Sequence, residues 1–347
     1  MMQPRDFGFG SPLRGSLDVG AAATTSPRSF GRTIPARERS AIDRIRGFFT
    51  RKSSAATAMP ASADLASMLS GFSMEVMPRT LARCTDFEAR VPAGTRVYVA
   101  HIDGTDIGDM VAAAARISRA GLAAMPHVPA RSLTNRAMLE DWLLRYRDAG
   151  ATQALVLAGG LDQPRGAFHS SMQLLETGLF DKHGFTRLHV AGHPEGNRDI
   201  DADGSDENLM MALRWKQAFR ERTDAEMAIV TQFAFDVAPV TAWAERLQRE
   251  GIDLPIHLGI AGPAKLQTMI KFALSCGVGP SVRVLQRRAA DISNLLLPYE
   301  PTEMLHDLMV HKRENPGSLV RQVHFFPFGG IAETLDFART HAAPRPA

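Results

Sequence analysis

The 347-residue sequence predicts an α/β fold, a (β/α)8 TIM barrel, and three observations support this prediction. Eight short apolar runs follow one another along the chain, and amphipathic helical patterns lie between them. The runs are continuous rather than alternating, as expected of parallel strands that are covered on both faces. Polar or glycine-rich residues stand at the end of most runs, where this kind of barrel carries its functional groups.

Eight strands are predicted from these runs, and they alternate with helical segments along the chain. They cover residues 73–77, 96–102, 122–127, 153–158, 187–192, 227–233, 255–260 and 322–326.

Helices are predicted between the strands, because seven of the eight strand-to-strand spacings fit one helix each. The pattern is clearest over 134–149, where apolar residues recur at helical spacing and Gly150 ends the helix. Similar patterns predict helices over 239–250 and 263–276.

The segment between the last two strands is longer than the others and predicts two further helices, over 281–297 and 301–313. We interpret this segment as an insertion, and one expectation is that it packs against a second copy in a homo-oligomer.

The N-terminal residues 1–60 predict a flexible basic tail with a short helix over 41–50, and residues 61–340 predict a single catalytic barrel domain. Residues 1–52 carry ten Lys and Arg against four acids, a net charge of +6, whereas the whole chain carries +3. The remainder is therefore −3, and its charge does not favour nucleic-acid binding. The tail also resembles an organelle transit peptide, but we favour a plain flexible tail.

Cysteine content and hydropathy predict a cytoplasmic protein with no membrane segment. The two cysteines, Cys84 and Cys276, lie far apart and form neither a metal motif nor a disulfide framework. No apolar run approaches the roughly 18 residues that a membrane helix requires.

Glu75 is the first candidate catalytic residue, because it interrupts the apolar strand SMEVM at 73–77. Burying a carboxylate costs several kcal/mol unless it has a partner or a task. Burial also disfavours the charged form of a carboxyl, which suits such a group to hold a proton and act as an acid.

Other polar and glycine residues are predicted at the same end of the barrel. A single histidine there is more often structural than catalytic. The glycine pairs at 159–160 and 329–330 fit either tight turns or close approach to a flat ligand. A metal hydrolase is disfavoured because the first strand offers Glu75 in place of a His-x-His pair. Serine hydrolase, Rossmann and P-loop chemistry are disfavoured as well.

Six segments in chain order resemble motifs of the methylenetetrahydrofolate reductase family, and the resemblance extends over residues 70–335. They are SMEVMP at 73–78, MPH at 125–127, AGHPEGN at 191–197, TQFAFD at 231–236, the segment 255–278, and VHFF at 323–326. The TQFAFD segment is the most specific of the six.

The resemblance implies the interconversion of 5,10-methylenetetrahydrofolate and 5-methyltetrahydrofolate, with bound FAD that is reduced by NAD(P)H. The family's strand-1 glutamate is the general acid toward the folate nitrogen, which implies that role for Glu75. The strand-6 glutamine contacts the pterin, which implies substrate binding by Gln232 and its neighbour Phe233. Cofactor contacts are implied for His127, Gly159, Gly160, His193, Asn197 and Lys216.

The sequence departs from the family at the end of strand 4, where the family has Arg-Gly-Asp and this chain has AGG at 158–160. The arginine and aspartate that face flavin and folate are therefore absent, although Asp162 and Arg165 lie nearby in the sequence. Four further family positions are changed, at Ala100, His193, Leu266 and Gly330.

These departures leave alternatives open. One is a flavin-free folate-dependent enzyme or methyltransferase on the same barrel, and oxidative methyl-group catabolism fits either reading. Another is a non-enzymatic folate-binding or partner subunit, against which the presence of Glu75 argues.

Overall fold

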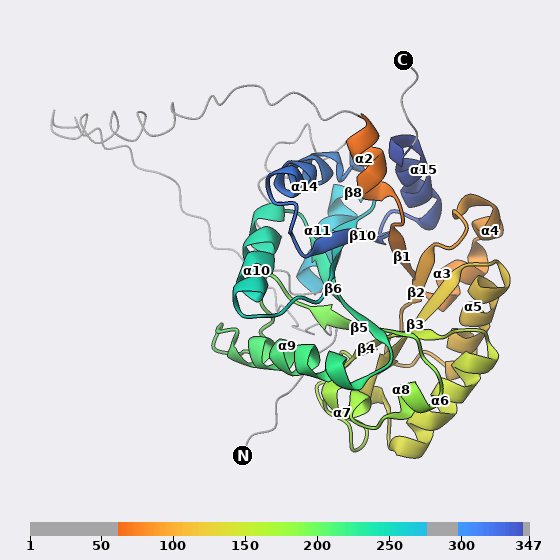
Figure 1. Cartoon of the computed structure of the whole chain (residues 1–347). Coiled ribbons are helices and arrows are strands. Elements are labelled where there is room, and N and C mark those ends of the chain that lie inside the picture. The colour runs from red at the N-terminus through yellow and green to blue at the C-terminus, as the bar shows by residue number, and fades with distance from the viewer. Residues whose placement is uncertain (1–61, 276–297, 343–347) are drawn as a thin grey trace, which may run out of the picture. The chain divides into compact units, whose positions relative to one another are not determined.

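The computed structural model describes residues 62–275 and 298–342, and its centre is a closed barrel of eight parallel strands (Figure 1). Neighbouring strands along the chain pair with each other, and the first pairs with the last to close the barrel. The barrel strands are β1 (Ser73–Val76), β2 (Arg96–Val99), β3 (Ala123–Pro129), β4 (Gln153–Leu157), β5 (Arg187–Gly192), β6 (Glu226–Ala234), β7 (Ile256–Ala261) and β10 (Val320–Phe326). The predicted (β/α)8 TIM barrel is confirmed.

Helices surround the barrel, and α2 lies beside α14 and α15 (Figure 1). The α-helices are α2 (Ser62–Leu69), α3 (Pro78–Arg83), α4 (Phe87–Arg90), α5 (Ile107–Arg119), α6 (Arg136–Asp148), α7 (Ser171–Leu175), α8 (Leu179–Lys182), α9 (Glu207–Phe219), α10 (Val237–Arg249), α11 (Leu266–Ser275), α14 (Thr302–Glu314) and α15 (Ile331–Ala342). Two short 3-10 helices are η1 (Ala130–Ser132) and η2 (Arg220–Arg222). In the described ranges, no helix is both long and apolar enough to span a membrane.

All eight predicted strands are present, and the predicted helices over 134–149, 239–250, 263–276 and 301–313 correspond to α6, α10, α11 and α14. Two connections differ from the expectation of one helix each. Between β1 and β2 the chain forms α3 and α4, and between β4 and β5 it forms α7 and α8, where Gly178 adopts the left-handed conformation that separates them. The predicted helices over 41–50 and 281–297 lie outside the described residues.

Two short strands of the segment between β7 and β10 form a small antiparallel sheet of their own. Its strands are β8 (Ala264–Lys265) and β9 (Pro298–Tyr299), and Ala264 is paired with Tyr299.

The strands separate two layers of side chains. On β1, Met74 and Val76 belong to the large apolar core between strands and helices, so Ser73 and Glu75 face the barrel interior. A smaller cluster fills that interior, formed by Tyr98, Met125, Leu155, Leu157 and Val230. Glu75 is therefore placed next to the last residue of β1, at the C-terminal ends of the strands, which we call the barrel mouth.

Several helices begin at the barrel mouth, and side chains of the chain itself cap their N-termini. A cap removes backbone N–H groups that a ligand would otherwise bind. The capping side chains are Asp106 for α5, Asn135 for α6, Asp201 for α9 and Asp236 for α10.

Candidate functional site

Glu75 and His127 form a close pair at the barrel mouth. Oε2 of Glu75 lies 3.2 Å from Nε2 of His127, and the two side chains are 19% and 4% exposed. The residues stand on β1 and β3, which β2 separates. The structure thus brings together the predicted acid and one predicted cofactor contact. A carboxyl and an imidazole at this distance can exchange a proton, and the partial exposure of Glu75 leaves it open to a ligand.

An ion pair between Arg165 and Asp103 lies beside His101 at the mouth. Nη2 of Arg165 lies 2.8 Å from Oδ1 of Asp103, and both side chains are about half exposed. The pKa of His101 is lowered to about 4, chiefly by burial and then by the neighbouring His127, while Asp103 opposes the shift. His101 is therefore neutral at neutral pH, and Arg165 is the cation of this group.

The glycine at the end of β4 is explained by local packing. Gly159 has a φ of +92°, and a Cβ atom there would lie 2.9 Å from Cβ of Pro129. Arg131 is buried nearby and donates hydrogen bonds to the backbone oxygens of Leu161 and His169. The backbone conformation and the hydrogen bonds of Arg131 therefore stabilise this turn. The presence of glycine at position 159 is explained without a bound ligand.

Gln232 and Phe233 lie near the end of β6, where the pairing with β7 shifts in register. Oε1 of Gln232 accepts a hydrogen bond from N of Phe233 at 3.2 Å, and the amide keeps its NH2 group as a donor. Phe233 is 1% exposed, and the rings of Phe326 and Phe328 pack against it. Phe233 thus builds the wall of the site.

The remaining predicted contacts lie on β5 and beyond it. His193 directly follows β5, and Asn197 in the next loop accepts a hydrogen bond from N of Asp199. Lys216 is 1% exposed and lies in the last turn of α9. Because α9 runs back from the mouth toward the strand starts, its last turn is the end farthest from the mouth, which does not support a cofactor contact by Lys216.

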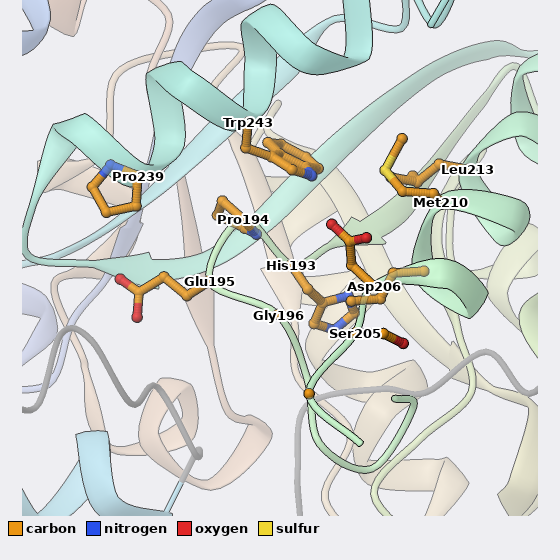
Figure 2. Close-up of a pocket in the computed structure, with 12 residues that line it drawn as sticks. His193, Pro194, Glu195, Gly196, Ser205, Asp206, Met210, Leu213, Pro239 and Trp243 are labelled. Atoms are coloured by element: carbon orange, nitrogen blue, oxygen red, sulfur yellow. The ribbon is translucent and has the colours of Figure 1, made fainter. Parts of the chain in front are cut away.

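A cavity of about 480 Å³ opens between the loop after β5 and the first turns of α9 and α10 (Figure 2). Its walls include the apolar side chains of Met210, Leu213 and Trp243 and the polar side chains of His193 and Asp206. Of the predicted site residues, His193 alone lines it. The cavity is therefore distinct from the Glu75 and His127 pair.

Sequence reasoning missed a polar network inside the barrel. Oη of Tyr98 lies 2.5 Å from Nδ1 of His189, and Oγ of Ser73 lies 3.0 Å from Nδ1 of His324. The ring of His257 packs against His189 with centroids 4.6 Å apart. The three histidines each interrupt an apolar run at its middle, and this signal could have predicted the network.

The two sides of the mouth differ in their fit to FAD. The side of β2 to β4 offers the edge of His127 for a flat ring and Arg165 for a phosphate. The loop after β5 is acidic, and Asp201 already accepts hydrogen bonds from the first N–H groups of α9, so this side does not fit a pyrophosphate. For a metal ion, residues 62–275 and 298–342 contain no suitable group of three His, Cys, Asp or Glu.

No protein-family model matches the chain. Similar solved structures include an uncharacterized protein from Clostridium thermocellum that binds two copies of 5-methyl-5,6,7,8-tetrahydrofolic acid, with 9% identity, a TM-score of 0.48, and coverage of 78% of this chain and 93% of that chain. Another is 7,8-dihydropteroate synthase from Vibrio fischeri ES114, with 11% identity, a TM-score of 0.40, and coverage of 79% and 93%. A third is oxaloacetate acetylhydrolase, with 12% identity, a TM-score of 0.41, and coverage of 83% and 90%. Similarities this distant carry no argument about function.

Proposed function

We propose that this chain is a folate one-carbon oxidoreductase, which interconverts 5,10-methylenetetrahydrofolate and 5-methyltetrahydrofolate at the barrel mouth. Bound FAD, reduced by NAD(P)H, would supply the hydride. The observation that carries the proposal is the 3.2 Å pair of Glu75 and His127, a partly exposed carboxyl backed by a buried imidazole where a barrel performs its chemistry.

Each residue has a defined task in this proposal. Opening the methylene bridge requires a proton on a folate nitrogen, and the Glu75 carboxyl donates it. Nε2 of His127 lies close enough to Glu75 to return a proton after each turnover. The NH2 group of Gln232 donates to an acceptor on the pterin edge.

The residues that fit FAD stand on one side of the mouth. His127 would lie along the flavin, and Arg165 would hold a phosphate in place of the arginine that the family has at the end of strand 4. His193 and Asn197 stand beside the acidic loop, so we expect them to contact no phosphate.

The first test is Glu75→Gln, which keeps the shape of the side chain and removes its acid. We expect a loss in kcat of about 10²-fold or more, with binding of 5-methyltetrahydrofolate retained. Turnover with NAD(P)H and calorimetric titration with 5-methyltetrahydrofolate measure the two quantities.

Glu226→Gln is the matched control. Glu226 also lies on a barrel strand, but at the end opposite the mouth, where it pairs with Arg187. This variant should change kcat by less than about twofold. A Glu75→Gln protein with unchanged kcat would remove Glu75 from the mechanism, and a folding defect in circular dichroism would assign it a structural role.

The second candidate is a flavin-free folate enzyme or methyltransferase. It is favoured by the turn after β4, where packing against Pro129 accounts for Gly159 and the family's arginine and aspartate are absent. This candidate keeps Glu75 and Gln232 for the pterin.

A visible spectrum during FAD titration separates the two candidates. We expect flavin bands that bleach with NADH or NADPH and return with 5,10-methylenetetrahydrofolate. Arg165→Gln should weaken FAD binding about tenfold, because it removes the phosphate partner. The control Arg198→Gln, in the acidic loop, should leave it unchanged. A colourless protein that takes up no FAD but turns over folate would instead establish the flavin-free candidate.

A further inference from the structure

The cavity between α9 and α10 has a rigid aromatic wall. A Cβ atom on Gly192 would lie 2.9 Å from Cη2 of Trp243 and 2.4 Å from Cγ2 of Ile229. The Trp243 indole is therefore packed directly on the backbone at the end of β5, and 9% of the residue stays exposed. Met210 and Leu213 extend this wall from α9. Such a surface is suited to cover a flat ring.

The ionised side chains that line the cavity are carboxylates, which accept hydrogen bonds. Figure 2 shows the Asp206 carboxylate between Trp243 and His193, and the Glu195 carboxylate beside Pro239. Asp206 holds the N-cap position of α9 but makes no side-chain cap bond. Its carboxylate pairs instead with Arg246, whose Nη2 lies 3.2 Å from Oδ1.

The charge of this region disfavours an anion. Among the described residues that line the cavity, no Lys or Arg is present. Residues 195–207 carry six acids and one arginine. The N-terminus of α9, which would otherwise attract an anion, is already occupied by the Asp201 carboxylate.

We propose that this cavity binds a small aromatic compound with a protonated nitrogen group. The ring lies against Trp243, Met210 and Leu213, and the charged N–H groups donate to Asp206. A volume of about 480 Å³ lies in the range of small-molecule sites, about 300–1,000 Å³. This site is separate from the Glu75 and His127 pair, and the proposal does not depend on the folate reaction.

Calorimetric titration of the full chain with benzamidine tests the proposal, and benzoate is the comparison because it has the same ring and the opposite charge. We expect saturable binding of one benzamidine per chain, at least tenfold tighter than benzoate. The variant Asp206→Asn should weaken benzamidine binding at least fivefold.

Two further variants control for location and for folding. Asp253→Asn removes an acid that pairs with Arg220 at 2.6 Å outside the cavity, and it should leave benzamidine binding unchanged. Ser205→Phe places a ring at the cavity wall on a loop and should abolish binding while circular dichroism stays unchanged. Absence of saturable binding, equal affinity for benzoate, or unaltered binding in Ser205→Phe would each overturn the proposal.

Discussion

At the scale of single residues, the two most deeply buried tyrosines provide a matched pair for measuring the interior network. Tyr98 and Tyr146 are both fully buried, but the Tyr98 hydroxyl lies 2.5 Å from Nδ1 of His189, whereas within the described chain the Tyr146 hydroxyl has no hydrogen-bond partner. Tyr98→Phe leaves a buried imidazole nitrogen unpaired and should lower the free energy of unfolding by about 1–3 kcal/mol. Tyr146→Phe removes an unpaired hydroxyl and should be neutral or stabilising. Urea unfolding measures both, and equal effects would show that the Tyr98 bond contributes nothing.

The types of residue in the sequence predicted some of the site residues but not how all of them are placed. Glu75 could be found because a carboxylate in an apolar strand needs a partner, and the structure supplies His127. The cofactor contact predicted for Lys216 rests on the family resemblance alone, and the structure places this residue in the last turn of α9. The amide oxygen of Gln232 is taken by its own strand at a register shift, and such irregularities leave no clear mark in a sequence.

At the scale of elements, the strands were predictable because each is a continuous apolar run. Among the longer helices, α6, α10 and α11 were predicted from several turns of periodicity. Helices α3, α4, α7 and α8 have four to six residues, too few for a periodic pattern to appear. The cavity could not be predicted either. Its walls come from a loop and two helices, and their meeting depends on the close contact of Trp243 with Gly192.

At the scale of the whole molecule, the barrel encloses histidines that are neutral when folded. Burial lowers the pKa of His189 and His324 well below its ordinary value and that of His257 to about 3, and neighbouring positive groups add to the effect. In the unfolded chain the same residues titrate near pH 6.5. The unfolded state therefore takes up protons first as the pH falls, so stability that is fully present above about pH 6.5 is lost below it.

The size of this loss can be predicted, because one pKa unit corresponds to about 1.4 kcal/mol for each group. Between about pH 7.5 and about pH 5.5, these three histidines together with His101, whose pKa burial lowers to about 4, should lower the free energy of unfolding by about 5 kcal/mol in total. The pKa of an ion-paired carboxyl such as that of Glu88 is lowered, so such groups titrate below this pH range. Urea unfolding at both pH values measures the loss. His257→Gln should remove about a quarter of it, and His169→Gln, at an exposed position, should remove none. Equal stability at the two pH values would mean that the interior histidines are already protonated or solvated in the folded barrel.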